Sequence, residues 1–259
     1  MMNPTNQDRV ALVTGAANRL GAAMARALAA AGWAVVIHYR GGRDDALALV
    51  AEIRAAGGHA AALKADLAMR RQRAGLVARA AACFGPLTLL VNNASAFEPD
   101  SVADLDEELW DRHFAVHLEA PAFLARDFAV QLPAEVQGNI VNIIDERVLH
   151  LTPNYFSYTL SKAALWTMTQ TMAQSLAPRI RVNAIGPGPT LREKGQSQAA
   201  FDKSQANAPL GYAANAGDVC DALLYLLDAR SVTGVMIPVD GGKHVDFPAP
   251  RGPTPRRAR

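Results

Sequence analysis

The chain has 259 residues, half of them apolar and few of them aromatic, with the charged residues dispersed along its length. This length and composition suit one folded domain with a sizeable core and exclude a disordered chain. A formal net charge of only +2 argues against nucleic acid or an anionic membrane as the partner.

Short apolar runs of β character alternate along the chain with longer segments of helical spacing. This alternation predicts one Rossmann-type α/β domain over residues 8–243, a doubly wound parallel sheet with helices on both faces. No internal repeat or linker divides it. The expected strands are residues 10–13, 34–37, 60–63, 87–91, 140–144, 180–185 and 235–239, and the clearest helices are 21–31, 44–56 and 155–177.

The first expected strand runs into the sequence TGAANRLG, residues 14–21, and a helix follows. Glycines at such a turn let the backbone approach a pyrophosphate, and the helix N-terminus presents free N–H groups to it. The spacing differs from the G-x-G-x-x-G motif. The alternative is therefore a tight turn that only caps a buried helix.

The second expected strand ends at Tyr39-Arg40 without the acidic residue that would bond the ribose of NAD. Arg19 in the first turn and Arg40 at this strand end offer two forked guanidinium groups, which suit a 2′-phosphate. We therefore expect NADPH as the cofactor, the alternative being a solvated Arg40. Asp44 and Asp45 are expected to begin the next helix.

Tyr158 and Lys162 are four residues apart in an apolar helical segment, a spacing that places them on one face of the helix. The lysine charge is expected to lower the pKa of the tyrosine, which could then act as an acid near neutral pH. Taken alone the pair is weak evidence, because a packed tyrosine beside a snorkelling lysine has the same spacing.

Further short motifs accompany the turn and the Tyr158/Lys162 pair along the chain. They are Asp66-Leu67, Asn92-Asn93-Ala94, RVNAIGPG at residues 181–188, Thr233-Gly234 and Asp240-Gly241-Gly242. With all of these motifs in order, the chain resembles the short-chain dehydrogenases/reductases over residues 8–243. The resemblance implies a seven-stranded parallel sheet, hydride transfer from a nicotinamide dinucleotide and a homotetramer. It implies that Tyr158 is the proton donor, that Lys162 holds the nicotinamide ribose and that Asp66 bonds the adenine. The residues expected at the cofactor are Gly15, Arg19, Leu20, Gly21, Tyr39, Arg40, Asp66, Leu67, Asn93, Ala94, Ser95, Tyr158, Lys162, Pro187 and Gly188.

Two positions depart from that family's usual pattern. Asp145 stands thirteen residues before Tyr158, where the family usually has a serine. A carboxylate there repels negative charge that develops on a ketone oxygen, but it suits a substrate with N–H donors such as the aminopyrimidinone edge of a pterin. His117 stands where the family often has a relay asparagine; a relay role and a bond to a backbone carbonyl both remain open.

The exchange of Asp for Ser is what pteridine reductases show, and the segment NNASAF at residues 92–97 resembles theirs. That match implies that Phe97 stacks on the pterin and that Ser95 and Arg19 lie near the substrate and the cofactor phosphates. The alternative for Phe97 is a core residue under a loop. Catalysis is assigned to Asp145, Tyr158 and Lys162, and no metal site is expected.

Three functions are weighed on these residues. The leading hypothesis is NADPH-dependent reduction of a dihydropterin (dihydromonapterin, dihydrobiopterin or dihydrofolate) to the tetrahydro form, with hydride added to a ring carbon and a proton to the adjacent nitrogen. The second is reduction of another carbonyl, such as a 3-ketoacyl thioester or a sugar-like ketone, against which Asp145 argues. The third is a regulator that binds NADPH without turnover, against which Tyr158 and Lys162 argue.

The remaining segments are expected to be less regular. Residues 187–217 are rich in Gly, Pro, Gln and Asn and are predicted to form a lid over the substrate. Residues 1–7 are expected to be flexible and to carry no signal peptide, and the Pro/Arg-rich residues 244–259 a solvated tail, with contact to nucleic acid as the less favoured alternative. Cys83 and Cys220 are expected to be buried free thiols in a cytoplasmic protein without membrane spans.

Overall fold

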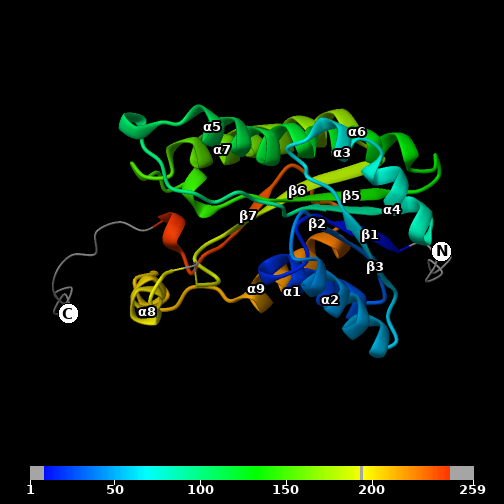
Figure 1. The fold of residues 1–259 in the computed structure, drawn as a ribbon, viewed down its shortest axis with the longest axis horizontal. Helices are drawn as coiled ribbons and strands as arrows, with labels where there is room; N and C mark the ends of the chain where they lie inside the picture. The colour runs from blue at the N-terminus through cyan, green and yellow to red at the C-terminus, as the bar shows by residue number, and fades with distance from the viewer. Residues whose placement is uncertain (1–8, 193–194, 246–259) are drawn as a thin grey trace, which may run out of the picture.

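One seven-stranded parallel sheet forms the centre of the protein (Figure 1). The computed structural model describes residues 9–192 and 195–245. The sheet order is β3-β2-β1-β4-β5-β6-β7, which confirms the predicted fold class. The strands are β1 Val10–Val13, β2 Ala34–Tyr39, β3 Ala60–Lys64, β4 Leu89–Asn92, β5 Gly138–Ile143, β6 Ile180–Pro187 and β7 Met236–Val239.

Helices cover both faces of this sheet because the strand side chains are apolar on both sides (Figure 1). Ala11 and Val13 of β1 pack in one core with α1, α2 and α9, whereas Val10 and Leu12 pack in the other with α4 and α6. The helices are α1 Arg19–Ala30, α2 Arg43–Ala55, α3 Arg70–Arg73, α4 Leu76–Phe84, α5 Glu107–Phe114, α6 Ala120–Gln131, α7 Phe156–Leu176, α8 Gln198–Ala206 and α9 Ala216–Asp228. Asp44 and Asp45 lie in the first turn of α2, as predicted.

The path from β4 to β5 contains a π-helical turn, Ala115–Glu119, that joins α5 to α6. Such turns are rare and often occur at functional sites. The turn places His117, which is 1% exposed, against α7. The strand order reverses between the neighbouring parallel strands β1 and β4, because β1 to β3 follow one another toward one edge of the sheet and β4 to β7 toward the other. In this architecture ligands bind at the carboxyl ends of the strands beside such a reversal.

The local structure differs from the expectations at one helix and one cysteine. The segment 187–217 contains the helix α8, whose first turn is capped by the Ser197 side chain accepting from the Ala200 N–H. Helix α8 was not expected because its few apolar residues, mostly alanines, form no clear apolar stripe in the sequence, and in the structure none of its residues is buried. Cys220 is buried, but Cys83 lies in the last turn of α4 and is only half-buried.

The chain ends are only partly described. The predictions for residues 1–7 and for 246–259 lie outside the described residues, while His244 and Val245 belong to the short 3₁₀ turn η5, Lys243–Val245. None of the helices in the described ranges has the length and apolar character needed to cross a bilayer. In the same ranges no three His, Cys, Asp or Glu side chains are grouped in a way that could hold a metal ion.

Candidate active site

A cleft of about 910 Å³ lies at the carboxyl ends of β1, β4, β5 and β6. It is lined by every residue predicted for cofactor, substrate or catalysis, which are Gly15, Arg19, Leu20, Gly21, Tyr39, Arg40, Asp66, Leu67, Asn93, Ala94, Ser95, Phe97, Asp145, Tyr158, Lys162, Pro187 and Gly188. The structure therefore brings together residues that are spread over most of the sequence.

The turn after β1 has the backbone that a phosphate-binding loop requires. Gly15 has φ +62°, and a Cβ there would lie 2.8 Å from the Ala94 Cα, so only glycine fits. A Cβ on Gly21 would lie 2.8 Å from the Ala16 Cα. Within the described chain, the side chain of Asn18, the N-cap of α1, accepts no hydrogen bond from the first turn. The first N–H groups of α1 can therefore serve an anion.

His38 supports this turn, a role that the sequence did not suggest. Its Nδ1 accepts a hydrogen bond from the Gly15 N–H at 3.1 Å, so its proton is on Nε2, which lies 3.1 Å from the Ala65 carbonyl oxygen. Burial lowers the pKa of His38 to about 4. The neutral imidazole thus ties the turn after β1 to the end of β3.

The two arginines predicted for the 2′-phosphate are both exposed, but they differ in their contacts. Arg19 has φ +52° and donates from Nη1 to the Arg192 carbonyl at 2.9 Å and from Nη2 to the Leu191 carbonyl at 3.4 Å. Arg19 therefore holds the segment after β6 against the turn after β1. Arg40 lies at the end of β2 and lines the same cleft.

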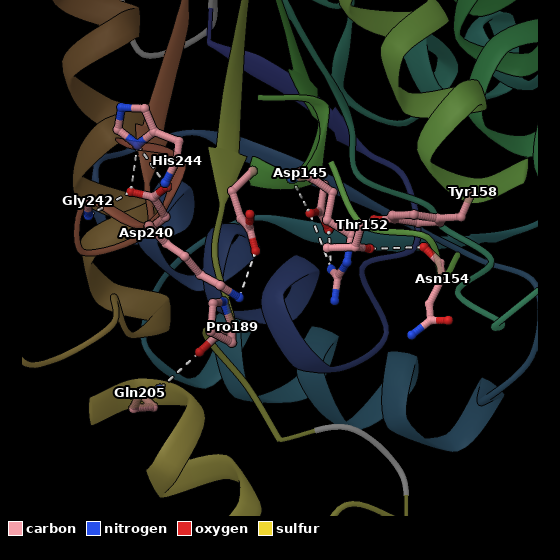
Figure 2. Close-up of polar contacts among 12 residues, drawn as sticks. Asp145, Thr152, Asn154, Tyr158, Pro189, Gln205, Asp240, Gly242 and His244 are labelled. Atoms are coloured by element: carbon pink, nitrogen blue, oxygen red, sulfur yellow. Dashed lines mark hydrogen bonds and ion pairs between the residues drawn. The ribbon is translucent and has the colours of Figure 1, made fainter. Parts of the chain in front are cut away.

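Asp145, Tyr158 and Lys162 meet between β5 and α7. The Tyr158 hydroxyl donates to Asp145 Oδ2 at 2.9 Å, and Figure 2 shows these two side chains pointing toward one another. Lys162, one turn further along α7, donates from Nζ to the Ile143 carbonyl at 2.8 Å. Lys162 is 2% exposed and Tyr158 4%, so both groups act in a nearly dry environment.

The prediction that Lys162 lowers the pKa of Tyr158 is wrong for this arrangement. Burial raises the pKa of Tyr158 well above its ordinary value, and the negative charge of Asp145 raises it further. The Lys162 ammonium donates to the Ile143 carbonyl and lies 5.7 Å from the centroid of the Tyr158 ring, and the groups that do lower this pKa are Arg147 and Ser95. Burial in turn lowers the pKa of Lys162 to about 8. The phenol therefore keeps its proton through the neutral range.

A pH-dependent stability difference is expected for Lys162→Met. The pKa of Lys162 is lowered from 10.5 to about 8 on folding, so its charged form opposes folding below pH 8, and this cost fades as the pH rises from 8 to 10.5. We expect Lys162→Met to have a free energy of unfolding about 1–3 kcal/mol higher than wild type at pH 7 and to lose that advantage toward pH 10. Urea unfolding at pH 7, 8.5 and 10 measures this; a pH-independent difference would contradict it.

His117 is a hydrogen-bonding centre behind Tyr158. Its Nε2 accepts from the Ala96 N–H at 3.1 Å and lies 2.9 Å from the Ser95 hydroxyl, so its proton is on Nδ1, which donates to Ser161 Oγ at 2.8 Å. Burial lowers the pKa of His117 well below its ordinary value. Of the two roles left open, the bond to a backbone carbonyl is not the one made, because the ring nitrogens bond the Ala96 N–H and the hydroxyls of Ser95 and Ser161, and the relay role stays a prediction. His117 instead positions the turn that carries Ser95 and Ala96.

Phe97 lies in the cleft and is half-buried, which excludes the alternative of a core residue. One of its neighbours is Tyr155, with ring centroids 4.5 Å apart and planes 11° apart. Arg147 lies beside both rings, with its guanidinium carbon 5.2 Å from the Phe97 centroid and 4.9 Å from that of Tyr155. Neither Tyr155 nor Arg147 was predicted for the site, since neither belongs to a motif.

Glu146, the residue after Asp145, is a further carboxylate of the cleft that was not predicted, and it pairs with Lys243 at 3.0 Å. This pair joins the segment after β5 to η5. The predicted lid, residues 187–217, begins at the end of β6. The Gln205 side chain donates to the Pro189 carbonyl at 2.9 Å, which ties α8 to the end of β6 (Figure 2). Whether this segment moves stays a prediction.

Comparison with known proteins gives a consistent class and differing substrates. A family model described as enoyl-(acyl carrier protein) reductase matches residues 15–244. An uncharacterised oxidoreductase of Methylorubrum extorquens is 38% identical over 245 residues (91% of this chain, 98% of the relative), and 3beta-hydroxysteroid dehydrogenase 1 of Eggerthella lenta is 35% identical over 245 residues (91% and 94%). The crystal structure of FolM alternative dihydrofolate reductase 1 from Brucella canis, complexed with NADP, has a TM-score of 0.90 and 45% identity, covering 98% of this chain and 100% of that one.

Proposed function

This chain belongs to the short-chain dehydrogenase/reductase family of oxidoreductases, and on that premise we propose that it reduces a dihydropterin to the tetrahydro form with NADPH. The observation that carries the proposal is the Asp145 carboxylate, 2.9 Å from the Tyr158 hydroxyl in a cleft shared with Phe97. A carboxylate there offers acceptors to a substrate that carries N–H donors. The resemblance to a structure named as a dihydrofolate reductase supports the same substrate class.

The residues at the cofactor end fit NADPH. The backbone around Gly15 and Gly21 would hold the pyrophosphate, Arg40 and Arg19 the 2′-phosphate, and Asp66 the adenine. Leu20, Tyr39, Leu67, Asn93, Ala94, Pro187 and Gly188 would complete that wall of the cleft. Lys162 would hold the nicotinamide ribose. When bound, NADPH supplies a hydride for a ring carbon of the substrate.

At the substrate end, the chain's residues orient the ring and hold a proton. Phe97 would stack on the pterin face and Ser95 would contact its edge, while Asp145 accepts from the ring's N–H donors. Tyr158 holds its proton because burial and Asp145 raise its pKa. Once hydride addition makes the neighbouring ring nitrogen strongly basic, Tyr158 can donate that proton to it.

NADPH oxidation by the purified full chain tests the proposal. Dihydromonapterin, dihydrobiopterin and dihydrofolate are compared with a 3-ketoacyl thioester and a sugar-like ketone, each with NADPH and with NADH. We expect at least one dihydropterin to exceed every simple ketone in kcat/KM, because only a donor-bearing edge can use Asp145. Because Arg19 and Arg40 line the cleft, NADPH should exceed NADH.

The opposite order of substrates would move the assignment to the carbonyl reductase alternative. Binding of NADPH without oxidation by any substrate would favour the regulator. The proposal also includes a homotetramer, on the family resemblance alone, and a cytoplasmic location, which is supported by the free thiols of Cys83 and Cys220.

A further inference from the structure

Arg147 follows Asp145 by two residues, in the 3₁₀ turn η4, Glu146–Val148. Its Nη1 lies 3.3 Å from both carboxylate oxygens of Asp145, and its guanidinium lies over the rings of Phe97 and Tyr155. The Arg147 side chain is 20% exposed and that of Asp145 14%, so the ion pair is largely shielded from water.

The acceptors of Asp145 are already in use in this arrangement. Oδ1 accepts from the Arg147 backbone N–H at 2.9 Å, Oδ2 accepts from the Tyr158 hydroxyl at 2.9 Å, and Nη1 of Arg147 reaches both oxygens. A carboxylate has about four lone-pair sites. A substrate with two N–H donors therefore cannot bind Asp145 fully while the guanidinium stays there.

The guanidinium of Arg147 and the edge of a pterin share their chemistry. Each is a planar group in which carbon joins nitrogen donors, and each can pair with a carboxylate while its flat face rests on an aromatic ring. Asp145 and Phe97, which the proposed function assigns to the pterin, are two of the groups that Arg147 contacts.

We propose that Arg147 is an internal competitor for the substrate site, so that a ligand binds by replacing the guanidinium on Asp145 and beside Phe97. This inference rests on the proposed function. It makes Arg147 a specificity-determining residue: a planar ligand with N–H donors can replace the guanidinium, whereas a simple ketone offers the carboxylate no donor in exchange. The opposing view, in which Arg147 stays in place and binds the substrate, predicts the reverse effect of removing it.

The test uses two substitutions at one position and a matched control. Arg147→Met keeps an unbranched apolar stem and removes the charge and the donors, and Arg147→Lys keeps the charge without the planar group. Arg112→Met removes an arginine from an ion pair with Glu98 outside the cleft. Binding of biopterin to the NADP⁺ complex is followed by pterin fluorescence, and the KM for dihydrobiopterin, dihydromonapterin and dihydrofolate by NADPH oxidation.

We expect Arg147→Met to bind biopterin about threefold to tenfold more tightly and to lower the dihydropterin KM similarly, because a partly buried ion pair and its ring contacts no longer compete. Arg147→Lys should fall between Arg147→Met and wild type. Arg112→Met should match wild type, and the Kd for NADPH should be unchanged in all variants.

Two results would overturn the proposal in distinguishable ways. If wild type binds and reduces pterins but Arg147→Met binds them equally or more weakly, the competitor role alone is wrong. If neither protein binds or reduces any pterin, the proposed function fails and this inference with it. Should Arg147→Met not fold, as judged by its thermal unfolding, Arg147→Lys carries the same comparison.

Discussion

Tyr158→Phe is expected to lower kcat for the preferred substrate by about 10²- to 10⁴-fold, the range typical of a lost general acid. The substitution removes one hydroxyl from a buried ring and leaves the ring's contacts with Phe97 and His117. It therefore removes the proton that Tyr158 shares with Asp145 without opening a cavity. The Kd for NADPH should rise by about fivefold at most, the worth of one neutral hydrogen bond.

Tyr155→Phe is the matched control for this prediction. Tyr155 lines the same cleft, with its ring centroid 6.4 Å from that of Tyr158, and phenylalanine preserves its stacking on Phe97. Its kcat should stay within about tenfold of wild type, because only a group placed at the reacting atoms gives the larger loss. Single-turnover NADPH oxidation separates the chemical step from product release. A Tyr155→Phe variant as impaired as Tyr158→Phe would show that the proton donor is assigned wrongly.

The fold and the cleft lining were predictable because they depend on local patterns. The run Val10–Val13 is apolar at every position, which indicates a strand buried on both faces, and the structure has a strand with those bounds. Gly15 is needed where φ is positive and the backbone approaches Ala94, a requirement that appears in the sequence as a glycine at a strand-to-helix turn. The spacing of Tyr158 and Lys162 places both on one face of α7.

The contacts that tune the site were not predictable, because they join residues without a shared motif. Tyr155 stacks on Phe97 and takes a left-handed backbone, φ +60°, just before α7 begins, and no motif in the sequence indicates either feature. His38, in β2, accepts a hydrogen bond from the N–H of Gly15, in the turn after the neighbouring strand β1. The pKa of Tyr158 is set mainly by its burial and by the Asp145 carboxylate, and the spacing of Tyr158 and Lys162 in the sequence reveals neither.

Asp145→Ser is expected to lower kcat/KM for the dihydropterin by about 10²- to 10³-fold, since two hydrogen bonds to a charged acceptor are worth about 3–4 kcal/mol together. The Kd for NADPH should change by less than about threefold, because other residues of the cleft are assigned to the phosphates, the adenine and the nicotinamide ribose. A serine offers a hydroxyl to a carbonyl oxygen, so activity toward a simple ketone should be retained or rise. Equal dihydropterin activity after this change would show that the carboxylate has no role in recognition.

Asp145→Asn gives the sharper form of the same test, because it changes charge and donor pattern but not shape. Its amide NH₂ would face the substrate's N–H donors, so it should impair dihydropterin reduction as strongly as Asp145→Ser without any gain on ketones. Misfolding would not explain such losses. The backbone role of Asp145 is to accept from the Arg147 N–H at the start of η4, and serine and asparagine oxygens can both accept that bond. If either variant keeps the wild-type unfolding temperature and NADPH affinity while losing the pterin, the loss belongs to the carboxylate charge and not to the turn that it caps.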